Sequence, residues 1–78
     1  MYRRLAKQLE ELGYSTLVYQ DSLYAEKGLL IVIISKVNHQ WYRVECIDSG
    51  NDITFVSRVK SAKQVLECVE QQREYFVL

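Results

Sequence analysis

The segment LLIVIISKV, residues 29–37, is the most apolar run in the chain. A short apolar run of this kind is typical of a strand that is buried on much of both faces. A strand with that degree of burial lies in the middle of a sheet. We therefore expect residues 29–37 to form the central strand around which the rest of the chain folds.

Three further segments are expected to be strands. Residues 14–20, YSTLVYQ, are rich in β-branched and aromatic side chains, and residues 40–49, QWYRVECIDS, alternate along the chain. Residues 52–59, DITFVSRV, complete the set. By contrast, residues 21–28, DSLYAEKG, are expected to be a loop or a ragged hairpin end. The sequence thus predicts four strands.

Two segments have the periodicity of amphipathic helices. The first, residues 2–12, is followed by Gly13, and glycine commonly ends a helix in the left-handed conformation. The second opens at Ser61, and Gln64 three residues later gives the signature of a capping box. The apolar positions are Tyr2, Leu5, Ala6, Leu9 and Leu12 in the first helix, and Ala62, Val65, Leu66, Val69 and Phe76 in the second.

The order of these elements, α-β-β-β-β-α, predicts an α+β fold. We expect a two-layer sandwich in which two helices cover one face of an antiparallel sheet. Residues 1–78 are expected to form a single compact domain. A chain of this length can bury a small core without a metal or a disulfide.

The charges on both expected helices run against the helix dipole. Arg3, Arg4 and Lys7 come early in the first helix, where acids are favoured, and Glu10 and Glu11 come late. The second helix repeats the pattern, with lysines around its start and glutamates further on. Four antiparallel strands would make the helices antiparallel, so that the basic start of each lies beside the acidic end of the other. The same polarity could instead serve a partner.

The composition argues against several classes of partner. The formal net charge is zero, so a strong and uniform attraction to nucleic acid or to an anionic membrane is not built in. The longest apolar run is far short of the roughly 20 residues that span a membrane. Residues 1–12, MYRRLAKQLEEL, are charged throughout, which is not typical of a signal peptide. We therefore expect a cytoplasmic protein with no membrane partner.

The residues that usually carry chemistry are sparse. Cys46 and Cys68 match no zinc spacing and are expected to be buried, reduced thiols, with a disulfide as the alternative. His39 is expected in a turn, without a neighbouring nucleophile or carboxylate to use it. Asp48 and Asp52 flank a turn, where Asp is favoured because it bonds its own backbone. We expect no catalytic site, no metal site and no cofactor.

The strand within residues 40–49 has apolar groups on both faces, although two helices can cover only one. Tyr42, Val44 and Cys46 form an uncharged set and are expected to face inward. The side chains then left on the outer face are Trp41, Arg43, Glu45 and Ile47, joined by alternate members of the central strand. Aromatic residues and arginine dominate protein interfaces, which predicts a partner-binding surface. Alternatively, these side chains cover one another, or the register places Trp41 inside.

A second hypothesis concerns Arg58, Lys60 and Lys63, which surround the start of the last helix. This arrangement resembles the double-stranded-RNA-binding domain, in which a lysine cluster at the start of the second helix grips phosphates. The resemblance implies a nucleic-acid-binding module. It stops short of membership because the cluster is thin, the net charge is zero and the family has three strands.

We favour a non-catalytic protein-binding module, with nucleic-acid binding as the alternative. Small domains of this kind often act as inhibitors or adaptors, an argument from analogy alone. In size and topology the chain also resembles small phage proteins that block host defence nucleases, although no residue pattern supports that link. A third possibility is a homodimer that forms through the open sheet face or an edge strand.

Overall fold

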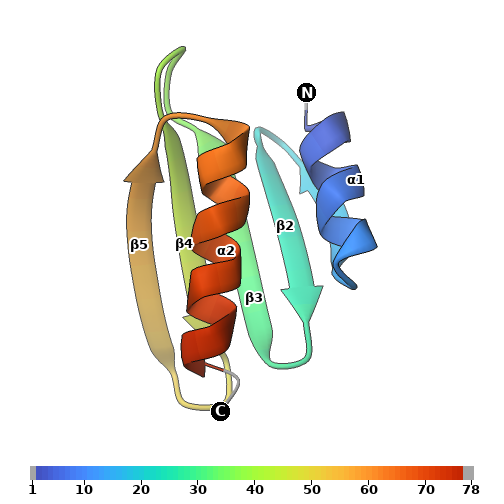
Figure 1. The fold of residues 1–78 in the computed structure, drawn as a ribbon, viewed down its shortest axis with the longest axis vertical. Coiled ribbons are helices and arrows are strands. Elements are labelled where there is room, and N and C mark those ends of the chain that lie inside the picture. The colour runs from blue at the N-terminus through green and yellow to red at the C-terminus, as the bar shows by residue number, and fades with distance from the viewer. Residues whose placement is uncertain (1, 77–78) are drawn as a thin grey trace.

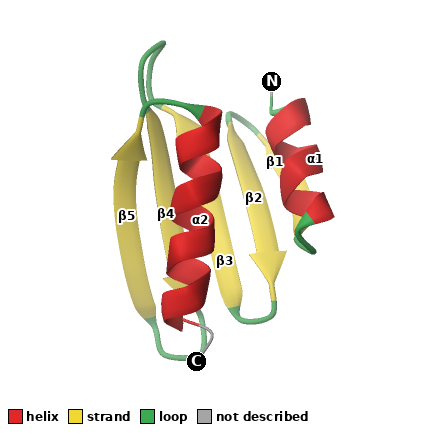
Figure 2. Cartoon of the chain, viewed as in Figure 1, coloured by secondary structure: helices red, strands yellow, loops and turns green. Residues whose placement is uncertain are grey.

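A computed structural model of the chain describes residues 2–76, with the side chains of residues 75 and 76 outside that description. It contains two helices and one five-stranded sheet (Figures 1 and 2). Among these residues no helix is long and apolar enough to cross a membrane. The elements are α1 (Arg3–Glu11), β1 (Ser15–Tyr19), β2 (Ser22–Lys27), β3 (Leu30–Lys36), β4 (Tyr42–Asp48), β5 (Ile53–Val59) and α2 (Ala62–Phe76).

Each strand pairs antiparallel with the next strand in the chain, which gives the order β1-β2-β3-β4-β5. The apolar strand β3 lies in the middle, with two strands on each side, as its composition predicts. Tight turns hold this register, and Gly28 adopts a φ of 60° in the two-residue turn between β2 and β3. The β3–β4 connection is longer than the tight turn expected at Asn38 and His39, because it spans residues 37–41.

Both helices pack on the same face of the sheet, so the two-layer α+β fold is confirmed (Figure 1). α1 lies over β1 and β2, whereas α2 lies mainly over β4. Gly13 ends α1 with a φ of 95°, as expected. The core between the layers consists of Tyr2, Leu5, Leu9, Tyr14, Leu23, Ala25, Leu30, Val32, Ile34, Val44, Cys46, Val65 and Val69.

The expected count of four strands is wrong, because residues 22–27 form β2 instead of a loop. Ala25, Glu26 and Lys27 have low strand propensity, which hid the strand. Its alternation is nevertheless regular, since Leu23 and Ala25 are buried against the core while Tyr24 points to the opposite face. Tertiary packing therefore outweighs local propensity in this segment.

The fifth strand reverses the expected relation between the helices. With an odd number of antiparallel strands, α1 and α2 run in the same direction, and Figure 1 shows both starting at the same end of the sheet. The expected pairing of a basic helix start with an acidic helix end is therefore wrong. Both basic starts lie at one end of the molecule.

The start of α2 is confirmed as a capping box. The Ser61 Oγ accepts a hydrogen bond from the Gln64 N–H at 3.2 Å. The Gln64 side-chain oxygen in turn accepts the Lys60 N–H at 2.7 Å, one residue earlier than in the usual arrangement. These bonds fix Lys60 where β5 turns into the helix.

Candidate functional site

Strand β4 shows how the sheet divides its side chains between two environments. Val44 and Cys46 are buried beneath the helices, and Tyr42 packs against the same core, so the expected inward set is confirmed. Arg43, Glu45 and Ile47 alternate with them and lie on the opposite side, which we call the uncovered face. No helix of the described chain packs on that face.

Each of the five strands contributes at least one apolar side chain to the uncovered face, among polar and charged ones. The register aligns Leu17, Tyr24 and Ile33 in one row across β1, β2 and β3, and Val56 continues this row beyond Glu45. Leu17 and Val56 are 64 % and 49 % exposed. We call this set the apolar patch; it consists of Leu17, Tyr24, Ile31, Ile33, Ile47 and Val56. A groove of about 300 Å³ lies along it, beside Leu17, Tyr24 and Ile31.

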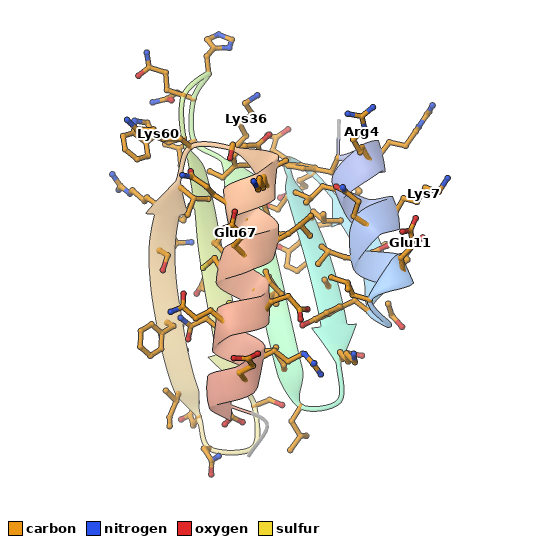
Figure 3. The ribbon with its side chains drawn as sticks, in the orientation of Figure 1. Arg4, Lys7, Glu11, Lys36, Lys60 and Glu67 are labelled. Atoms are coloured by element: carbon orange, nitrogen blue, oxygen red, sulfur yellow. The ribbon has the colours of Figure 1, made fainter. Side chains whose placement is uncertain are left out.

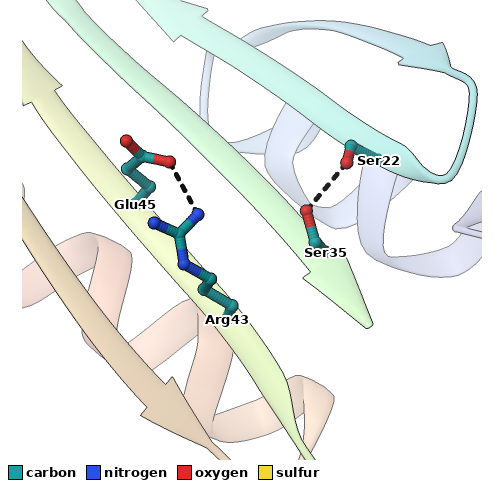
Figure 4. Close-up of polar contacts among 4 residues, drawn as sticks. All are labelled: Ser22, Ser35, Arg43 and Glu45. Atoms are coloured by element: carbon teal, nitrogen blue, oxygen red, sulfur yellow. Dashed lines mark hydrogen bonds and ion pairs between the residues drawn. The ribbon is translucent and has the colours of Figure 1, made fainter. Parts of the chain in front are cut away.

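Polar contacts on the uncovered face gather towards one end of the strands (Figure 4). The Arg43 Nη1 donates to the Glu45 Oε1 at 2.9 Å, and both side chains are partly exposed. Arg43 also lies directly opposite Arg58 on β5. Like charges at facing positions destabilise a sheet, and Arg58 has no carboxylate within ion-pair distance among the described residues. Arg58 is therefore available to an anionic group outside the chain, beside an Arg43 that already pairs with Glu45.

Trp41 lies away from the apolar patch. It precedes β4, and the Lys60 Nζ sits 5.0 Å from the centre of its ring in a cation–π contact. The indole lines an open groove of about 610 Å³ between β5 and α2. The other lining residues are Ser57, Arg58, Val59, Lys60, Gln64, Glu67, Cys68 and Gln71. The structure thus brings Trp41 next to Arg58 and Lys60 and separates it from Ile47.

The basic residues gather where both helices begin, at what we call the basic end (Figure 3). The Lys36 N–H donates to the Tyr2 hydroxyl at 2.8 Å, which joins the end of β3 to the start of α1. The Lys36 ammonium lies 5.5 Å from the centre of the Tyr42 ring. Both helix dipoles also point their positive ends in this direction. The basic end comprises Arg3, Arg4, Lys36, Arg43, Arg58, Lys60 and Lys63, of which Arg4, Lys36 and Lys60 are labelled in Figure 3.

Acidic residues dominate the opposite end of the molecule, so a net charge of zero conceals two poles. This acidic end comprises Glu26, Asp48, Asp52, Glu70 and Glu74, whereas Glu11 lies beside Lys7 on α1, between the two ends (Figure 3). The exceptions are Lys27 and Arg73 at the acidic end and, near the basic residues, Asp21, Glu45, which pairs with Arg43, and Glu67, which lines the same groove as Lys60. The charges are therefore not uniformly distributed, and the net charge of zero does not argue against an anionic partner at the basic end.

Cys46 and Asp48, two of the residues that could carry chemistry, are held in the core and in a turn. Burial raises the pKa of Cys46 to about 12, with a further increase from the neighbouring charge of Cys68. Asp48 accepts hydrogen bonds from Gly50 and from both nitrogens of Asn51, which lower the pKa of its carboxyl. The Asp48 carboxylate therefore closes the β4–β5 turn. Among the described residues no three His, Cys, Asp or Glu side chains are grouped to hold a metal ion.

Sequence reasoning located part of this geometry. Of the expected partner-binding set, Arg43, Glu45 and Ile47 share the uncovered face, whereas Trp41 belongs with the expected nucleic-acid set at the basic end. The contributions of β1, β2 and β5 to the apolar patch were missed. Apolar residues at alternate positions of each strand could have indicated the patch, but which of them lie side by side can be predicted only when the register is known.

Comparison with known protein families, with curated proteins and with solved structures finds no match. The uncovered face and the basic end are therefore the two candidate binding surfaces of the described chain.

Proposed function

We propose that this protein is a non-catalytic protein-binding module and that the uncovered face is its docking surface. The observation that carries this proposal is the apolar patch, to which all five strands contribute on the side away from the helices and which, within these strands, only Glu45 interrupts. Contiguous exposed apolar surface marks interaction sites, because water-exposed apolar area is costly to leave unpaired. Such a module inhibits or recruits according to what its partner does at the covered surface, so an inhibitor or adaptor role is part of this proposal.

The polar groups around the patch indicate the chemistry of the partner. Arg43 and Arg58 face each other across β4 and β5, and Glu45 neutralises only part of their charge. A carboxylate on the partner would complete this arrangement with charge-assisted hydrogen bonds. We therefore propose a protein surface that is apolar at its centre and acidic where it meets these arginines.

The test compares two exposed apolar side chains in affinity capture from the native cell lysate. Ile33→Ser removes the centre of the apolar patch, whereas Val37→Ser removes an apolar side chain from the β3–β4 loop, where Val37 is 51 % exposed. We expect Ile33→Ser and Arg58→Glu to lose a nuclease-resistant protein partner that the wild type and Val37→Ser retain. Circular dichroism and melting temperature verify that each variant is folded. Retention of the partner by both Ile33→Ser and Arg58→Glu would refute the proposal.

A second candidate function is nucleic-acid binding at the basic end. The observation that favours it is the fixed position of Lys60 against Trp41, beside Arg58, since aromatic and basic groups together bind nucleic-acid strands. Binding of this kind weakens steeply with salt, because phosphate contacts release counterions. Lys60→Glu and Lys63→Glu should each reduce that slope, while Glu74→Gln at the acidic end should leave it unchanged. A captured partner that disappears after nuclease treatment would favour this function over the first.

A further inference from the structure

Both edge strands of the sheet, β1 and β5, lack the usual devices that block pairing with another chain, and β5 is the longer of the two. Every residue of β5 pairs with one residue of β4, so the described edge strand is regular and has no bulge. It contains no proline, and Arg58 is its single charged residue. Ile53, Phe55 and Val56 are 46 %, 42 % and 49 % exposed. Proline, charge and bulges are the usual devices that block edge-to-edge association, and β5 has little of them.

We propose that two copies of this chain join their β5 strands antiparallel, centred on Val56, to form one continuous sheet. This register uses the full length of both strands, because Val56 is the midpoint of β5. The facing pairs are Ile53 with Val59, Thr54 with Arg58 and Phe55 with Ser57, each formed twice, and Val56 with its own copy, formed once on the two-fold axis.

Charge supports this register at the ends of the strands. Asp52 precedes β5 and Lys60 follows it, so the same register places the backbone of Asp52 in one copy opposite that of Lys60 in the other, at both ends. The Lys60 ammonium would leave the Trp41 ring to reach this carboxylate. The wider distribution agrees, since antiparallel copies set each basic end beside an acidic end. The corresponding pairing of β1 with itself would be centred on Leu17 and would bring Tyr14 opposite Gln20, with no charge to select it.

The groove between β5 and α2 supplies a matching shape. Ser57 and Val59 line it, and both lie on the helix-covered side of β5. Phe55 and Ile53 lie on that same side. In the proposed register they face Ser57 and Val59 of the other copy, so each copy offers two apolar side chains at the mouth of its partner's groove. Val56 and Arg58 belong both to the uncovered face and to the edge strand, but the rest of that face stays accessible in this dimer, so the inference does not require the proposed function.

The test measures molecular mass by light scattering and sedimentation over a wide range of protein concentrations. We expect a wild-type dimer that dissociates on dilution. Val56→Lys places two lysines side by side at the two-fold axis and should give a monomer at every concentration. Leu17→Lys is the matched control, because Leu17 is the midpoint of the other edge strand and is 64 % exposed. It should leave the dimer intact.

A second pair of variants tests the register. Lys60→Glu would face Asp52 of the other copy and should weaken the dimer, whereas Lys63→Glu makes the same change of net charge within α2 and should not. Circular dichroism verifies that the variants are folded. A wild type that stays monomeric at the highest concentration would overturn the inference. So would a dimer that survives Val56→Lys, or one that is lost with Leu17→Lys instead.

Discussion

The covered and uncovered faces of the sheet are built from the same strands and differ in what lies against them. On β3, Val32 and Ile34 are completely buried under the helices, while Ile31 and Ile33 point to the other side and stay partly exposed. All four are β-branched aliphatic residues. Composition alone therefore does not distinguish the face that holds the fold together from the face that is left for a partner.

The difference shows what each face contributes to stability. The covered side chains exchange water for close-packed neighbours from two helices, which is the main source of folding free energy. Those on the uncovered face contact mainly their cross-strand neighbours. The side chains on the covered face are thus required for folding. Those on the uncovered face are apolar although neither α1 nor α2 packs against them.

Adjacent isoleucines on β3 allow this comparison to be tested directly, with the largest expected effect. Ile34→Ala opens a cavity in the core and should reduce the free energy of unfolding by about 2–5 kcal/mol. Ile33→Ala, one residue earlier, should cost about 1 kcal/mol, within the range of strand propensity on a partly exposed surface. Urea denaturation of both variants measures the difference.

Equal losses from these two variants would mean that the uncovered face is as well packed as the core. The case for a docking surface would then fail. If Ile33→Ala is mild, the same variant becomes useful for partner capture, because any loss of binding would not be a loss of fold.

The sequence predicted the layers of this fold more accurately than its strand count. The runs at 29–37 and 52–59 and both helices have strong periodicity, and all of them form the expected elements. The segment SLYAEK was missed because its inward positions are only Leu23 and Ala25, and its remaining residues are polar or aromatic. A single missed strand then inverted the expected direction of one helix, since the direction depends on whether the strand number is odd or even.

The candidate site was predictable to the extent that strand alternation determines it. Arg43, Glu45 and Ile47 fall on one face because each lies two residues from the next. Trp41 precedes the strand, where alternation no longer applies, and the five-residue loop turns its ring towards Lys60. The basic end was not predictable, because it arises from residues far apart in the sequence that only the five-strand topology brings together.

The two cysteines should report the same contrast by their reactivity. Cys46 is fully buried on the covered face, while Cys68 on α2 is only half-buried. A maleimide should therefore modify Cys68 first in the native protein and Cys46 only at the rate of unfolding. Cys46→Ala and Cys68→Ala identify the two reactions by mass spectrometry. Rapid native labelling of Cys68→Ala would show that Cys46 is not held inside the core.

Cys46 also makes the covered face sensitive to alkaline pH. Burial raises the pKa of Cys46 from 9.0 to about 12 in the folded protein. The thiol therefore contributes fully to the free energy of unfolding below its unfolded pKa of 9.0, and this contribution is lost as the pH rises towards 12. Tyr14 acts in the same direction, since burial raises its pKa from 10.0 to about 12. Cys46→Ala should flatten the first part of this decline in unfolding experiments above about pH 9. An unchanged profile would exclude Cys46 as its source.

Asp48 is the last residue of β4, and it should have a smaller effect on the free energy of unfolding at acid pH. Hydrogen bonds from Asn51 and Gly50 lower its folded pKa. Its contribution is therefore present above the unfolded value of about 3.9 and is lost as the pH falls through the folded value. Asp48→Asn should flatten the stability profile in that range. Parallel profiles for wild type and Asp48→Asn would contradict this role.

The smallest expected effect concerns Glu45, which lies between apolar neighbours on the uncovered face and pairs with Arg43. Partly exposed ion pairs are worth about 0–1 kcal/mol, so Glu45→Gln should lower the free energy of unfolding by less than that. It should also leave Arg43 and Arg58 to repel each other, which salt screens. The variant should therefore recover stability as salt increases, whereas Glu67→Gln on α2 should not. Since an acidic partner would relieve the same repulsion, Glu45→Gln should bind that partner more tightly than the wild type does. Weaker binding would instead show that Glu45 itself contacts the partner.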